Sequence, residues 1–186
     1  MPTTATMPQD IAIIRYPDPR LRKMSEAVTQ FTPELRELAL RMVELMKEAR
    51  GVGLAAPQVG QNIRLFIINP TGEEDDVHFY VNPVLSEAEG EEEGEEGCLS
   101  LPNITTKVWR SKNLLMQAQD LEGNPIEERA QGYIARIWQH ETDHLNGTLI
   151  IDRMGPVAKL AARRVLKELQ QKWDDEHPGD KKKKRG

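Results

Sequence analysis

The stretch QHETDHLNG, residues 139–147, places His140 and His144 four positions apart, with Glu141 beside the first histidine. On an α-helix, residues i and i+4 lie on one face, so both imidazoles can reach one metal ion. The apolar segment IARIW just upstream indicates that this helix lies in the core. Glu141 can take a proton from a metal-bound water and return it to a leaving amine. The stretch therefore predicts a central helix that carries half of a catalytic metal site.

A catalytic site of this kind uses a third protein ligand and keeps one position open. The metalloprotease pattern H-E-x-x-H-x-x-G-x-x-H is excluded, because its last histidine would have to stand where the chain has Ile150. Glu168 is a second candidate, on a helix face that we expect to be exposed. Cys98, the single cysteine, is the third candidate, since a thiolate is a strong ligand for a divalent cation. A set of Cys98, His140 and His144 would be open and catalytic in type.

Length and composition suit one soluble domain with a few peripheral residues: 186 residues, 38 % hydrophobic and 30 % charged. No apolar run approaches the roughly 20 residues of a transmembrane helix, and the first ten residues lack the features of a secretory signal. One cysteine excludes an internal disulfide framework. We therefore expect a cytoplasmic protein with no membrane or DNA partner.

The hydrophobic pattern changes twice along the chain. It predicts an amphipathic helix that opens at Pro33, helical character again at about residues 130–145, and a last helix from Pro156. Between them, strand-like segments are separated by turns, at residues 63–69, 78–85, 104–110 and 113–120. This order predicts an α+β fold, with small mixed or antiparallel strands around the central H-E-x-x-H helix and a helix towards each terminus.

The same pattern predicts how the chain is divided. We expect a disordered N-terminus at residues 1–10 and a metal-dependent catalytic domain at residues 11–155. A C-terminal helix at 156–175 and a basic disordered tail at 176–186 follow. The stretch EAEGEEEGEE, residues 87–96, contains seven glutamates and predicts a solvated loop. We further expect an ion pair between Glu96 and Arg110, and packed positions for Trp109 and Trp138.

Three stretches together resemble one family, the peptide deformylases. They are GVGLAAPQVG at residues 51–60, EGCLS at 96–100 and QHETDHLNG at 139–147, in the family's order and spacing, and the resemblance covers about residues 11–154. It implies an enzyme that removes the N-formyl group from the N-terminal formylmethionine of newly synthesised polypeptides. It also implies one divalent metal ion on Cys98, His140 and His144. That ion would be Fe²⁺ in vivo, and Zn²⁺, Ni²⁺ or Co²⁺ can substitute, since the ligand set accepts each of them.

The resemblance also implies roles for individual residues. Glu141 would be the general acid/base for attack by a metal-bound hydroxide. The side chain of Gln58 and the backbone N–H of Leu99 would donate to the developing oxyanion. The substrate would run beside the chain as an added strand and place its methionine side chain in an apolar pocket. The residues implied in substrate binding are Val52, Gly53, Gly97, Tyr133 and Ile137.

Two positions depart from the family's pattern, and two other functions stay open. Gly94 stands where many members have a branched apolar residue that walls the pocket, and Asn103 stands where glycine is frequent. The basic C-terminal helix and the tail KKKKR suggest docking on ribosomal RNA, as the family's bacterial members are understood to dock. The alternatives are a metalloendopeptidase, which gives Cys98 no role, and a non-catalytic, metal-stabilised ribosome-binding domain.

Overall fold

A computed structural model describes residues 11–179 of the chain. The predicted disordered N-terminus and residues 180–186 of the predicted tail lie outside the described residues. Five antiparallel strands form one sheet in the order β1-β2-β3-β4-β5. The strands are β1 (Gly53–Ala55), β2 (Leu65–Ile68), β3 (His78–Cys98), β4 (Leu101–Gln119) and β5 (Pro125–Gln131). The helices are η1 (Pro19–Arg22), α1 (Pro33–Glu48), η2 (Ala56–Val59), α2 (Gly132–Leu145), α3 (Ile150–Arg153) and α4 (Pro156–Glu176).

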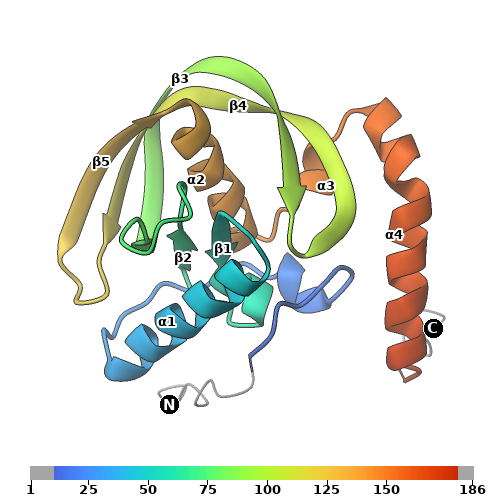
Figure 1. Cartoon of the computed structure of the whole chain (residues 1–186), viewed down its shortest axis with the longest axis horizontal. Helices are drawn as coiled ribbons and strands as arrows, with labels where there is room; N and C mark the ends of the chain where they lie inside the picture. The colour runs from blue at the N-terminus through green and yellow to red at the C-terminus, as the bar shows by residue number, and fades with distance from the viewer. Residues whose placement is uncertain (1–10, 180–186) are drawn as a thin grey trace.

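Strand β2 is buried on both faces, and this sets the layers of the fold. Its side chains alternate in direction, as in any strand. Leu65 and Ile67 pack in the cluster that contains the apolar face of α1, whereas Phe66 and Ile68 pack in the cluster that contains α2. The long strands β3 and β4 arch over α2, and β5 continues the sheet on the far side (Figure 1). The predicted α+β architecture is confirmed, and α2 is the helix that carries residues 139–145.

The prediction of a loop at residues 87–96 is wrong, because these residues belong to β3. They pair with β4, for example Glu93 with Trp109 and Glu95 with Lys107. An irregularity in register between Ser86 and Glu89 accompanies a positive φ of 48° at Glu87. Such bulges bend a strand and increase its twist, in keeping with the arch of the β3–β4 ribbon in Figure 1. The stretch is exposed as expected, except for Gly94, which is half-buried, and Glu96, which is buried.

Other boundaries differ by smaller amounts. The two strands predicted at 104–110 and 113–120 form the single strand β4, and the pattern did not reveal β5, which runs to Gln131 just before α2 begins. Trp138 is buried as expected, but the expectation for Trp109 is wrong. Val108 and Arg110 point inwards, so the alternation of the strand leaves the Trp109 side chain 61 % exposed.

Helix α4 covers one side of the domain and stands apart from the other helices in Figure 1. One of its faces packs into a third apolar cluster, through Ala162 and partly buried Val165, Leu166 and Leu169. The helix runs one residue beyond the predicted end at 175, and the ring of His177 stacks on Trp173 at a centroid distance of 3.7 Å. No helix in residues 11–179 is long and apolar enough to cross a membrane.

Candidate active site

Three side chains that can bind metal meet where the end of β3 crosses α2. His140 and His144 lie one turn apart on α2, and Cys98 is the last residue of β3. The ligand atoms that these three residues offer all lie within 4.8 Å of one another. The Cys98 Sγ and the His144 Nε2 are 3.4 Å apart, and the two imidazole rings have a centroid distance of 5.1 Å. The residues that the motifs placed together are therefore adjacent in the fold.

The chemistry of the donor set fits one divalent metal ion. Metal bonds of the usual length to sulfur and imidazole nitrogen put neighbouring donors about 3.4–3.6 Å apart, which matches the contact of Cys98 with His144. Burial holds the pKa of His144 well below its usual value, which favours the neutral imidazole that a metal requires. Within the described part of the chain, Oε2 of Glu141 is buried without a hydrogen-bond partner. Glu141 directly follows His140 in the sequence.

Glu96 fixes the orientation of the His140 ring. The Nδ1–H of His140 donates to Oε2 of Glu96 at 3.0 Å, which leaves Nε2 as the free lone pair on the ring. Arg110 donates to both oxygens of the same carboxylate, at 2.8 and 2.9 Å, so the expected ion pair is present and is buried. A metal-binding histidine is commonly held in this way by a carboxylate on its other nitrogen.

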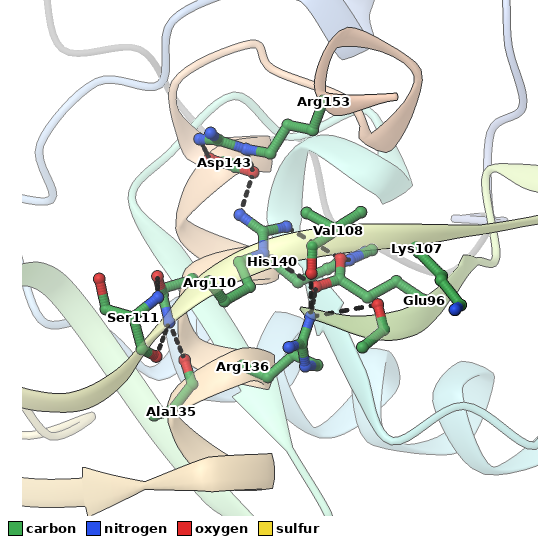
Figure 2. A network of polar contacts seen from close by, with 12 residues as sticks. Glu96, Lys107, Val108, Arg110, Ser111, Ala135, Arg136, His140, Asp143 and Arg153 are labelled. Atoms are coloured by element: carbon green, nitrogen blue, oxygen red, sulfur yellow. Dashed lines mark hydrogen bonds and ion pairs between the residues drawn. The ribbon is translucent and has the colours of Figure 1, made fainter. Parts of the chain in front are cut away.

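The network of polar contacts extends beyond Glu96 and Arg110 (Figure 2). Arg110 also donates to Asp143 at 2.7 Å, and Asp143 accepts in turn from Arg153. Arg136 donates to Glu96 at 3.0 Å from a different direction than Arg110. Burial acts to raise the pKa of Glu96, but the hydrogen bonds from Arg110 and His140 outweigh it and lower the pKa to about 2. Glu96 is therefore a buried carboxylate that stays ionised.

The pKa of Glu141 is shifted in the opposite direction from that of Glu96. Glu141 is buried on α2, and this burial raises the pKa of its carboxyl group to about 7. A group with a pKa near the working pH exchanges protons most effectively. Gly53 of β1 lies directly against it, because a Cβ atom at position 53 would come within 2.9 Å of the Glu141 Cδ. A residue larger than glycine at position 53 would therefore clash with the Glu141 carboxylate.

Gln58 points its amide N–H group at the site. Its Oε1 accepts from the backbone N–H of Ala55 at 2.9 Å, which fixes the direction of the amide. Its Nε2 donates to the Ser100 hydroxyl at 3.2 Å and lies 3.6 Å from the Cys98 Sγ. A side chain that is buried and held at both ends offers a donor in a fixed position. Ser100 was not among the expected site residues, although it closes the EGCLS motif.

A pocket of about 400 Å³ opens beside these residues. Its lining includes every residue implied in substrate binding, namely Val52, Gly53, Gly97, Tyr133 and Ile137, together with Gln58, Cys98, Leu99, His140 and Glu141. Strand β1 borders it and is an edge of the sheet, because β2 is its one neighbour in the described residues. An edge strand can pair with an extended peptide.

The comparisons with known proteins agree with this geometry. The family model described as polypeptide deformylase matches residues 11–160. A peptide deformylase from Acidobacterium capsulatum is 41 % identical over 160 residues, which are 85 % of this chain and 94 % of that protein.

Solved structures give the same result. A crystal structure of the peptide deformylase from Plasmodium falciparum superposes with a TM-score of 0.86 at 38 % identity, covering 89 % of this chain and 98 % of that one. A plant peptide deformylase gives a TM-score of 0.89 at 34 % identity, covering 93 % and 96 %. The matches favour neither an endopeptidase nor a non-catalytic domain. This chain belongs to the peptide deformylase family of hydrolases.

Proposed function

We propose that Cys98, His140 and His144 hold one divalent metal ion, beside which Glu141 moves protons during hydrolysis of the N-formyl group of nascent formylmethionyl polypeptides in the cytoplasm. The observation that carries the proposal is the meeting of the three ligand atoms within 4.8 Å of one another, beside a pocket whose lining includes Glu141 and Gln58. When bound, the ion supplies a Lewis acid for the formyl carbonyl and lowers the pKa of a water molecule.

Glu141 is the general acid/base. Its carboxylate takes a proton from the attacking water as the new C–O bond forms at the formyl carbon. It then gives that proton to the leaving amine as the C–N bond breaks, so that formate and a free N-terminal amine result. The pKa of about 7 allows both directions of transfer near neutral pH.

Gln58 and Leu99 stabilise the negative charge that develops on the formyl oxygen. The amide of Gln58 is fixed by Ala55 and Ser100, so little reorganisation is needed when the charge forms. The backbone N–H of Leu99, next to Cys98, is the second donor. The backbone of Val52, Gly53 and Gly97 pairs with the substrate, and Tyr133 and Ile137 contact its methionine side chain.

The ion in the cell is Fe²⁺ in this proposal, with Zn²⁺, Ni²⁺ or Co²⁺ able to substitute. One thiolate and two imidazoles accept all four ions, so the family resemblance decides. A thiolate on a ferrous ion is open to oxidation, and Cys98 is partly exposed at the pocket. The Fe²⁺ form should therefore lose activity in air much faster than the Co²⁺ or Ni²⁺ form.

The reaction is tested by formate release from formyl-Met-Ala-Ser, with acetyl-Met-Ala-Ser as the matched control. The protein is prepared without oxygen and loaded with Fe²⁺, and its metal content is measured. We expect turnover of the formyl peptide alone, and loss of both metal and turnover in Cys98→Ala, His140→Ala and His144→Ala. A wild-type protein that holds one metal ion per chain and releases no formate would refute the proposed reaction.

A second proposal concerns the ribosome. The outer face of α4 exposes Lys159, Arg163 and Lys167, which can contact RNA phosphates. Deletion of α4 would uncover the apolar cluster around Ala162, so charge reversal of the three basic residues is the sharper test. Co-sedimentation with ribosomes at low salt should be lost in the triple glutamate variant. Binding equal to that of the wild type would refute docking through α4.

A further inference from the structure

Arg136 is a charged residue in the middle of the apolar segment IARIW, and it is only 8 % exposed. It lies on α2, one turn before His140. Its guanidinium donates to the backbone carbonyls of Glu92 on β3 and Val108 on β4, both at 2.8 Å, and to the Glu96 carboxylate at 3.0 Å. Figure 2 shows the guanidinium beside Val108 and Glu96. One side chain thus ties α2 to both strands of the β3–β4 ribbon.

Gly94 makes room for this guanidinium. A Cβ atom at position 94 would lie 2.7 Å from Cζ, 2.8 Å from Nη2 and 2.9 Å from Nε of Arg136, distances that real Cβ contacts do not show. The backbone does not require glycine here, since Gly94 is not among the described glycines with positive φ. A side chain at position 94 would therefore clash with the guanidinium of Arg136, which would have to move.

We propose that Gly94 and Arg136 form one coupled unit, in which the guanidinium fills the space of a side chain at position 94 and holds Glu96 in place behind His140. Arg136 is thus a positioning residue, because it acts on the site through Glu96. It also lines the substrate pocket, so the guanidinium that packs against Gly94 forms part of the pocket wall. The positioning role rests on the proposed function, since it takes His140 as a metal ligand.

The geometry predicts how substitutions combine. Gly94→Val alone pushes a buried cation away from its acceptors. Arg136→Met alone leaves a void beside Gly94 and removes one of the donors to Glu96. In the double variant, valine adds as many non-hydrogen atoms as methionine lacks relative to arginine, and it adds them where the guanidinium was. Arg110 still holds both oxygens of Glu96 in that variant.

The test compares metal loss from the loaded enzyme to excess EDTA in wild type, Gly94→Val, Arg136→Met and the double variant. We expect each single change to speed the loss by about tenfold or more, and the double variant to lose metal at least about fivefold more slowly than either single variant, since contacting residues do not act additively. Arg129→Met is the matched control, because Arg129 pairs with Glu87 on the exposed surface and should leave the rate unchanged.

Two results would overturn the inference. Multiplicative effects in the double variant would show that the two positions are independent. Unchanged metal loss in Arg136→Met would show that Arg136 does not position the site. A parallel double-mutant cycle on urea unfolding tests the steric coupling without reference to metal. His140→Ala separates the two proposals, since metal held as firmly by His140→Ala as by wild type would refute the ligand set and leave the coupling in unfolding intact.

Discussion

The substitution Arg110→Met tests the buried network at its centre. Arg110 makes two hydrogen bonds to Glu96 and one to Asp143, and its side chain is 3 % exposed. Removal of one partner from a buried ion pair costs about 3–5 kcal/mol, because the other charge stays buried. Glu96 keeps its contacts with Arg136 and His140, and Asp143 keeps Arg153, so we expect the lower end, about 3 kcal/mol. That is a large part of the ~5–15 kcal/mol that stabilises a typical domain.

Urea unfolding of the metal-free protein measures this loss without a contribution from metal binding. With a slope of about 2 kcal/mol per molar urea, the midpoint should fall by about 1.5 M. Arg41→Met is the control, since Arg41 pairs with Glu44 on the surface of α1 and such pairs contribute about 0.3–0.5 kcal/mol. A midpoint for Arg110→Met that shifts no more than that of Arg41→Met would refute the view that the network holds the site together.

Three further predictions concern other parts of the molecule. Burial raises the pKa of Asp18, but its hydrogen bonds with Arg20 outweigh this and hold it below the ordinary value of 3.8. This carboxylate therefore stabilises the fold above that pH. The difference in unfolding free energy between wild type and Asp18→Asn should shrink as the pH falls from 7 to 2.5. A difference that stays constant over this range would contradict the role of the ionised Asp18. Gly53→Ala should lower kcat by about 100-fold with metal content unchanged, because the new methyl group displaces the Glu141 carboxylate; an unchanged kcat would contradict the contact. Asn103 has a φ of 63°, a left-handed conformation that a β-branched side chain disfavours. Thermal unfolding should therefore show Asn103→Val destabilised by about 1–2 kcal/mol and Asn103→Gly close to wild type. Equal effects of the two substitutions would contradict backbone strain at this position.

The motif at residues 139–147 could be recognised in the sequence because its two histidines are four residues apart, which is about one turn of a helix. His140 and His144 fall on one face of α2, and the structure brings Cys98, rather than the other candidate Glu168, beside them. Pairing of Glu96 with Arg110 was also accessible, since both flank the cysteine segment on adjacent strands. These features depend on the spacing of residues within one helix, or on a small number of candidate partners in the sequence.

The rest depends on how strands pair, which local sequence does not encode. Glutamate and glycine are poor strand formers, so residues 87–96 indicated a loop. Pairing with β4 over the whole stretch overrides that preference. The same register turns Trp109 outwards and brings the carbonyl of Val108 to Arg136. The role of Arg136 was therefore hidden, because its acceptors are backbone atoms of two other elements. The positive φ of Asn103, a backbone conformation that suits glycine, is likewise shown only by the fold.

The most direct test of the central claim is the rate of formate release by Glu141→Gln loaded with metal. Glutamine keeps the shape of glutamate and cannot take up the proton of the attacking water. The account predicts one metal ion per chain, as in wild type, and a loss in kcat of about 10²–10⁴-fold, the usual contribution of a general acid/base. A metal-loaded variant that keeps more than about a tenth of the wild-type rate would show that another group moves the protons.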